Sequence, residues 1–162
     1  KRTNLWGREM QVRQLTGHIG AEITDTDLSN PKPDFIDKIK KIWLDHKVLV
    51  FRDQNITREE HIAFGRCFGE LEIHPFAPSP ENYPEIVKIK SDDKVQYAAS
   101  NWHSDVTWRL EPSLGSILRM LECPENGGDT LFLTTFTRVE LPIICSFSLI
   151  APIRLISILT EE

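Results

Sequence analysis

Residues 48–51, Val-Leu-Val-Phe, form a short apolar run between two stretches whose apolar residues recur with helical spacing. In the first stretch, lysines separate the apolar positions, which are Phe35, Ile36, Ile39, Ile42 and Trp43. Pro33 stands just before them, and proline is common in the first turn of a helix. The pattern therefore predicts an amphipathic helix from about Pro33, followed by a buried strand.

The second helical stretch opens with residues 57–60, Thr-Arg-Glu-Glu, which is the sequence of a capping box. In such a box the threonine hydroxyl accepts a hydrogen bond from the glutamate amide, and the glutamate side chain accepts one from the threonine amide. We expect the helix to end at Gly69. The residues expected on its inner side are Ile62, Ala63, Cys67 and Phe68.

Two further apolar segments, residues 86–90 and 116–121, are expected to be strands, and prolines and glycines predict loops at residues 75–84 and 124–128. Two helices packed on a sheet of short strands predict a mainly β fold with flanking helices, of the α+β class. A length of 162 residues suits a single domain, residues 1–162. The net charge of −5 does not favour nucleic-acid binding. Three scattered cysteines do not form a disulfide framework, so we expect a cytoplasmic protein.

The last part of the chain differs in composition from the rest. All nine lysines lie at or before Lys94, and all eight glycines lie at or before Gly128. Residues 143–159 are almost wholly apolar, but these 17 residues are interrupted by Pro152 and Arg154. A membrane span needs about 20 apolar residues, so we expect buried strands here and no membrane association.

The segment that points most clearly to chemistry is residues 101–108, Asn-Trp-His-Ser-Asp-Val-Thr-Trp. On a strand, His103 and Asp105 would project to the same side because side chains alternate. An imidazole beside a carboxylate suits a divalent metal, and one more histidine would complete a 2-His-1-carboxylate triad. On spacing alone, a surface histidine and aspartate near a turn remain the alternative.

Residues 127–130, Gly-Gly-Asp-Thr, lie further downstream. The two glycines would let the backbone approach a ligand closely, and the Thr130 hydroxyl could hydrogen-bond a ligand carboxylate. Taken alone, a tight turn is the alternative. The histidines at positions 18, 46 and 61 are expected to be structural or solvent-facing residues.

Five segments together resemble the taurine dioxygenase/TfdA (TauD/TfdA) family of Fe(II)- and 2-oxoglutarate-dependent dioxygenases. They are residues 15–28 (LTGHIGAEITDTDL), 46–57 (HKVLVFRDQNIT), 64–75 (FGRCFGELEIHP), 101–107 (NWHSDVT) and 127–132 (GGDTLF). They occur in the family's order and with its spacing. The resemblance covers residues 15–132 and fades over residues 133–162, a divergent apolar tail.

The resemblance implies a double-stranded β-helix, or jelly-roll, braced by helices and incomplete in this chain. It implies that His103 and Asp105 bind Fe(II), that 2-oxoglutarate and O2 are consumed, and that Thr130 helps to hold the distal carboxylate of 2-oxoglutarate. His74 and Val106 would line the substrate pocket. The reaction implied is hydroxylation of a small organic anion, coupled to release of succinate and CO2.

The resemblance also bears on the substrate. Taurine-specific members carry an asparagine where this chain has Ala99 and a tyrosine where it has Ala77. Without these two polar contacts, a larger or less polar anion fits better than taurine: an alkyl sulfate, an alkyl sulfonate or an aryloxyalkanoate. The resemblance is also compatible with homo-oligomerisation.

The family places a second iron histidine and a 2-oxoglutarate-binding arginine far downstream, but no histidine follows His103 in this chain. Iron held by two protein ligands would bind weakly, and the cosubstrate would lack its ion pair. We therefore expect little or no oxygenase activity from the 162-residue chain. Two alternatives stay open: a catalytically dead relative or fragment that acts as a binding domain, and a cupin-like metal enzyme of another reaction class.

Overall fold

The computed structural model of the protein describes residues 9–90, 110–111, 113–122, 125, 130–132 and 155–160, the last segment by its backbone alone. The chain divides into two compact units. We call residues 1–27, 31–55 and 114–162 the sheet unit, and residues 28–30 and 56–113 the loop unit.

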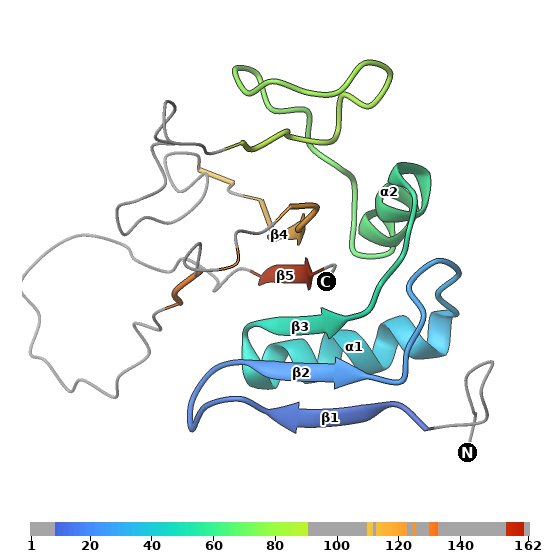
Figure 1. The fold of residues 1–162 in the computed structure, drawn as a ribbon, viewed down its shortest axis with the longest axis vertical. Coiled ribbons are helices and arrows are strands. Elements are labelled where there is room, and N and C mark those ends of the chain that lie inside the picture. Colours follow the sequence, from blue (N-terminus) through green and yellow to red (C-terminus); the bar gives the residue numbers. More distant parts are fainter. Residues whose placement is uncertain are drawn as a thin grey trace, which may run out of the picture. The chain divides into compact units, whose positions relative to one another are not determined.

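Five strands form the sheet of the sheet unit, in the order β1-β2-β3-β5-β4 (Figure 1). Their bounds are β1 Gln11–Gln14, β2 Ala21–Thr24, β3 Leu49–Arg52, β4 Gly115–Arg119 and β5 Leu155–Thr160. β1 and β2 are antiparallel, with Val12 opposite Ile23, and the other neighbouring pairs are parallel. The sheet is therefore mixed, and its last strand in the sequence lies between β3 and β4.

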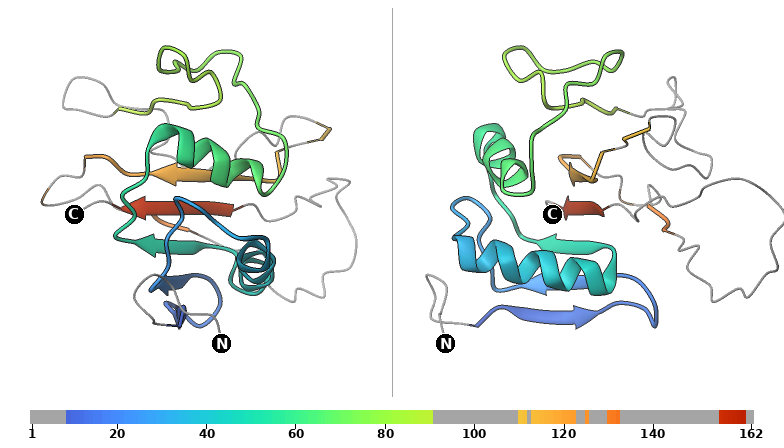
Figure 2. Two further views of the ribbon diagram at one scale, coloured as in Figure 1. Left: turned by 90° about the vertical axis from the view of Figure 1, so that its right-hand side faces the viewer. Right: turned by 180° about the vertical axis from the view of Figure 1, so that it is seen from behind.

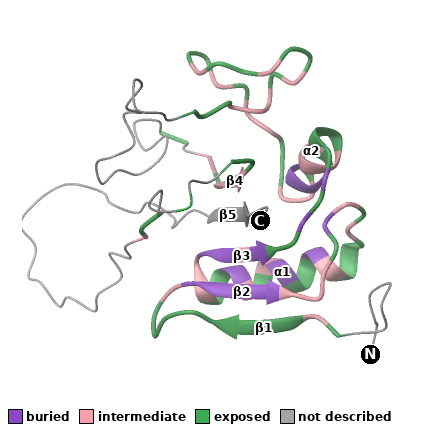
Figure 3. Ribbon diagram, in the orientation of Figure 1, coloured by how far each residue is buried: buried purple, intermediate pink, exposed green. Residues whose placement is uncertain are grey.

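Helix α1, Pro33–His46, connects β2 to the parallel strand β3 and lies against one face of the sheet (Figures 1 and 2). A parallel connection of this kind requires a crossover segment, which the helix supplies. The buried apolar residues here are Ala21, Ile23, Ile36, Ile39, Trp43, Val48, Leu49 and Phe51. Figure 3 shows this burial concentrated in β2, β3 and α1. The predicted helix from Pro33 and the strand after it are both confirmed.

The turn between β1 and β2 depends on Gly20, whose φ of +90° is rarely adopted by residues with a side chain. Its carbonyl accepts a hydrogen bond from the Leu15 amide at 2.9 Å, and its own amide donates to the His46 carbonyl at 2.8 Å. His18 is exposed in this turn, as expected. Gly20 thereby joins the β1–β2 turn to the end of α1.

Glu22 of β2 is a buried acidic residue between two arginines. Arg13 of β1 donates from Nε and Nη2 to Glu22 Oε2 at 2.9 and 2.7 Å, and Arg52 of β3 donates from Nε to Oε1 at 3.0 Å. The hydrogen bond from Arg52, and then the one from Arg13, hold the pKa of Glu22 below its usual value. These three side chains therefore connect β1, β2 and β3.

The loop unit contains helix α2, Arg58–Arg66. The predicted capping box is confirmed: the Glu60 amide donates to Thr57 Oγ1 at 3.2 Å, and the Thr57 amide donates to Glu60 Oε2 at 2.7 Å. These bonds satisfy amides that would otherwise lack partners at the start of the helix.

The inner side of α2 differs from the prediction. Phe64 and Gly65 are buried, whereas Ala63 is exposed and Cys67 is only half-buried. The Phe64 ring meets the Phe68 ring edge to face at 5.2 Å, one helical turn further along. The helix ends at Arg66, before the predicted stop at Gly69, because the next two amides bond to carbonyls three residues back: Cys67 to Phe64 at 3.1 Å and Phe68 to Gly65 at 3.0 Å.

The predicted strand at residues 86–90 is wrong, since this segment is irregular. Two of its amides bond within the loop: the Ile86 amide donates to the Tyr83 carbonyl at 3.1 Å, and the Lys88 amide donates to the Pro78 carbonyl at 2.8 Å. The prolines of the loop set these turns, as the prediction of a loop at residues 75–84 anticipated.

Two other strand predictions are confirmed in part. Residues 116–121 overlap β4, and the end of the apolar run at residues 143–159 overlaps β5, while the rest of that run lies outside the described residues. Two helices with a mixed sheet confirm an α+β arrangement for the described part of the chain, and the jelly-roll stays a prediction. Within that part, no helix is long and apolar enough to cross a membrane.

Candidate substrate-binding site around His74

The site residues expected from the sequence fall into three groups. His103, Asp105 and Val106 lie outside the described residues. Thr130 is described and exposed, in the sheet unit, and His74 is described and half-buried, in the loop unit. Among the described residues, no group of three His, Cys, Asp or Glu side chains could hold a metal ion, so the iron site stays a prediction.

His74 lies in the irregular segment that follows α2, and its ring is fixed by backbone amides. Nδ1 accepts hydrogen bonds from the amides of Phe76 at 3.2 Å and Ala77 at 2.9 Å. A ring nitrogen that accepts hydrogen bonds carries no proton, so the neutral imidazole carries its proton on Nε2. The side chain therefore offers an Nε2–H donor, which suits an anionic oxygen.

The immediate neighbours of His74 are apolar and exposed. Ile73 is 60% exposed and Phe76 is 87% exposed, and the Phe76 ring lies edge to face with the His74 ring at 6.4 Å. In ligand sites a polar group fixes the orientation of the ligand, and apolar surface adds affinity. This arrangement suits an anion that carries an apolar group.

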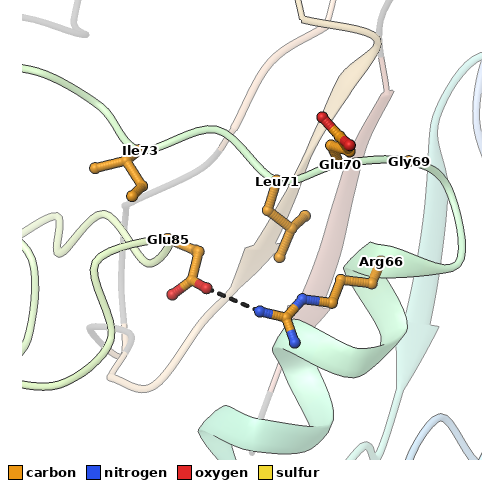
Figure 4. Close-up of a pocket in the computed structure, with 6 residues that line it drawn as sticks. All are labelled: Arg66, Gly69, Glu70, Leu71, Ile73 and Glu85. Atoms are coloured by element: carbon orange, nitrogen blue, oxygen red, sulfur yellow. Dashed lines mark hydrogen bonds and ion pairs between the residues drawn. The ribbon is translucent and has the colours of Figure 1, made fainter.

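A pocket of about 500 Å³ lies within the loop unit, a volume in the range of small-molecule sites. It is lined by Arg66, Gly69, Glu70, Leu71, Ile73 and Glu85. Figure 4 shows the Arg66 guanidinium reaching from α2 to the Glu85 carboxylate, where Nη2 and Oε1 are 3.0 Å apart. Ile73 directly precedes His74, so the pocket and the histidine share one segment of chain.

A second contact ties the loop to the start of α2. The Tyr83 hydroxyl donates to Glu59 Oε1, and the Arg58 guanidinium lies over the Tyr83 ring at 5.5 Å. The hydrogen bond lowers the pKa of Glu59 and raises the pKa of Tyr83, because it favours the carboxylate and the protonated phenol.

The segment that precedes His74 has one further polar contact, where the Ser113 hydroxyl donates to Glu72 Oε2 at 2.7 Å. The sequence did not predict this contact or those of Tyr83 and Glu85. Each of the three has at least one partner in an irregular segment, and no hydrophobic period or motif relates the two partners.

The same chain resembles known proteins in sequence and in structure. Residues 11–140 match the model of the family described as "Taurine catabolism dioxygenase TauD, TfdA family". An alkylsulfatase of Acinetobacter baylyi is 37% identical over 135 residues, which are 82% of this chain and 42% of the relative. An alpha-ketoglutarate-dependent sulfonate dioxygenase of Saccharomyces cerevisiae is 30% identical over 160 residues, 87% of this chain and 39% of the relative.

The crystal structure of a taurine dioxygenase from Burkholderia xenovorans superposes with a TM-score of 0.64 at 36% identity, covering 73% of this chain and 42% of that chain. The chain thus spans about two fifths of the length of the relatives it matches. These matches confirm the resemblance drawn from the five sequence segments, and the family model extends it to residues 11–140.

Proposed function

Because the chain belongs to the taurine catabolism dioxygenase TauD, TfdA family, we propose that it forms part of an Fe(II)- and 2-oxoglutarate-dependent dioxygenase. The reaction is hydroxylation of a small organic anion, with succinate and CO2 as the products of the cosubstrate. The observation that carries this proposal is the family match over residues 11–140, which includes all five expected site residues. Relatives named for sulfonate, sulfate ester and (S)-phenoxypropionate support the substrate class.

In the proposed site, His103 and Asp105 hold the iron, and bound iron supplies the activation of O2. An imidazole and a carboxylate are suitable donors for Fe(II), but a facial triad needs one more histidine. The family resemblance places that histidine downstream of the first two ligands, and no histidine follows His103 in this chain, so we propose that these residues supply two of the three ligands. Thr130 is exposed, and its hydroxyl is proposed to hydrogen-bond the distal carboxylate of 2-oxoglutarate.

The proposed role of His74 is to bind the anionic group of the substrate through Nε2–H. Ile73 and Leu71, which line the pocket, then contact the apolar part of the substrate. Ala77 adds no polar contact, which favours an alkyl sulfate, an alkyl sulfonate or an aryloxyalkanoate over taurine. Val106, beside the iron ligands in sequence, is proposed to contact the substrate as well.

The wider architecture follows the same proposal. The chain is assigned to one domain that contributes the front portion of a double-stranded β-helix, in a cytoplasmic protein that can form homo-oligomers. Residues 133–162 are proposed to be a divergent apolar tail, of which residues 133–140 still fall within the family match.

The test is a chimeric protein in which residues 1–140 are followed by the C-terminal part of the Acinetobacter baylyi alkylsulfatase. We expect the chimera to convert 2-oxoglutarate to succinate in the presence of Fe(II) and an alkyl sulfate. The conversion should be lost in His103→Ala and should fall at least tenfold in His74→Ala, which removes the substrate donor but leaves the iron ligands.

The 162-residue chain alone is the matched control, and it should form no succinate above the rate without substrate. Substrate-dependent succinate from the chain alone would show that its iron site is complete. A folded chimera that binds Fe(II) and the alkyl sulfate without turnover would favour the binding-domain alternative.

A further inference from the structure

Residues 78–88 form a closed loop directly after the residue that holds the His74 ring. The Lys88 amide donates to the Pro78 carbonyl at 2.8 Å and closes the base of the loop. Inside it, the Tyr83 amide donates to the Pro80 carbonyl at 3.1 Å. Because Pro78 follows Ala77 directly, the position of this loop constrains where the Ala77 amide lies relative to His74 Nδ1.

Two contacts attach this loop to opposite ends of α2. We call the Tyr83–Glu59 hydrogen bond, with Arg58 over the Tyr83 ring, the Tyr83 contact. We call the Arg66–Glu85 interaction the Glu85 ion pair. Glu59 and Arg66 are seven positions apart, or about 10 Å along a helix axis, so two attachments fix both the place and the direction of the loop.

We propose that the Tyr83 contact and the Glu85 ion pair position His74 for anion binding, by holding the Ala77 amide on Nδ1 and so keeping the ring proton on Nε2. This inference rests on the proposed role of His74 in substrate binding. Tyr83 and Glu85 act through the loop and do not touch the substrate, so they are positioning residues.

The physical reason is the direction of the hydrogen bond that His74 can make. With the proton on Nε2, the ring donates to an anionic oxygen. With the proton on Nδ1, the ring presents a lone pair at Nε2, which repels that oxygen. The amides of Phe76 and Ala77 can pair only with an unprotonated Nδ1, so the tautomer that binds anions is stabilised before the anion arrives.

The expected change in the tautomer ratio of His74 follows from the exposure of the contacts that hold the loop. The Arg66 side chain is 63% exposed, and exposed ion pairs shift an equilibrium by up to about fivefold. Removing one attachment should therefore raise the ratio of the Nδ1–H to the Nε2–H tautomer by about two- to fivefold. Removing both the Tyr83 hydroxyl and the Glu85 charge should raise it further, because both attachments of the loop to α2 are then weakened.

The experiment measures the ring ¹⁵N chemical shifts of His74 in the labelled 162-residue chain, at a pH where the ring is neutral. Tyr83→Phe removes the hydroxyl but keeps the ring for Arg58, and Glu85→Gln removes the charge but keeps the shape. We expect each variant to shift the His74 ¹⁵N signals toward the Nδ1–H tautomer, and the double variant to shift them most.

Arg13→Gln is the matched control, because it breaks an Arg–Glu ion pair of the same kind in the sheet unit. It should leave the His74 signals unchanged. Unchanged signals in both single variants would overturn the proposal, and so would an equal shift in Arg13→Gln. If the double variant loses the native amide spectrum of α2, the two single variants decide the outcome.

A titration with hexyl sulfate separates this inference from the proposed function. We expect hexyl sulfate to perturb the His74 signals of the wild-type chain, and to do so more weakly in each single variant. If the variants shift the tautomer while hexyl sulfate leaves the wild-type signals unchanged, the role of His74 in substrate binding fails. The control of the tautomer by the two contacts then stands.

Discussion

The sheet unit and the loop unit are stabilised by different kinds of contact. In the sheet unit, β2, β3 and α1 bury a continuous set of apolar side chains, and Leu49 and Phe51 are at most 1% exposed. In the loop unit, residues 67–90 contain no helix or strand, and polar contacts at the surface attach them to α2 and to one another. Burial of apolar area stabilises far more than exposed ion pairs do. The difference indicates that the sheet unit supplies more of the stability, while the proposed binding segment lies in the less stable loop unit.

Among the variants that test this difference between the two units, Phe51→Ala is expected to lower the free energy of unfolding most. The variant leaves a cavity at a fully buried position of β3, and such a change costs about 3–5 kcal/mol. Urea unfolding of the 162-residue chain measures the loss. The control is Leu44→Ala on α1, where the side chain is 70% exposed and the free energy of unfolding should change by less than about 1 kcal/mol.

A smaller effect is expected from Glu22→Gln, which removes the carboxylate that Arg13 and Arg52 share. The loss at neutral pH should be about 1–2 kcal/mol, because both arginine side chains are partly in solvent. A loss of stability as large as that of Phe51→Ala would contradict this difference between the units, because polar contacts would then contribute as much as apolar burial.

The same residue predicts a pH dependence. The pKa of Glu22 is lower in the folded chain than in the unfolded chain, so the carboxylate binds fewer protons when folded. Its stabilisation is therefore fully present above the ordinary glutamate pKa of about 4.3 and is lost as the pH falls through the lower folded value. Urea unfolding at a series of pH values should show this loss in the wild type and a flatter profile in Glu22→Gln.

In the loop unit, Thr57→Ala removes the hydroxyl that caps α2 and should cost about 1 kcal/mol. Amide hydrogen exchange measures the effect where it arises, in the first turn of α2. Thr57→Ser keeps the hydroxyl and should retain most of the protection. Equal loss of protection in Thr57→Ser would show that the methyl group, and not the cap, stabilises the helix.

The smallest effect is expected from Ser113→Ala, which removes the hydrogen bond to Glu72. A half-exposed bond of this kind contributes about 1 kcal/mol or less. Exchange of the amides in the loop unit should increase modestly, while those of β2 and β3 stay protected. Deprotection of β2 and β3 would show that the two units unfold as one.

The sequence predicted the sheet unit better than the loop unit, for a physical reason. Helical spacing from Pro33 and the apolar run at residues 48–51 report side-chain burial directly, and both predictions are confirmed. The capping box at Thr57 is a local motif and is also confirmed. The segment at residues 86–90 has the composition of a strand, but the amides of Ile86 and Lys88 pair within the loop.

The candidate site shows the same division. The resemblance identified His74, but no pattern in the sequence indicates that the amides of Phe76 and Ala77 fix its ring. No pattern in the sequence indicates the ion pair between Arg66 and Glu85 either, because its partners are brought together only by the path of the loop. Glu22 went unnoticed because an acidic residue between apolar neighbours on a strand normally faces solvent.

The central claim is that this chain supplies two iron ligands, His103 and Asp105, and not the third. The most direct test is an anaerobic titration of the 162-residue chain with Fe(II) and 2-oxoglutarate, followed by the charge-transfer absorption of the complex. The account predicts weak binding that falls at least tenfold further in His103→Ala and in Asp105→Ala. Tight, stoichiometric binding that survives both substitutions would contradict it.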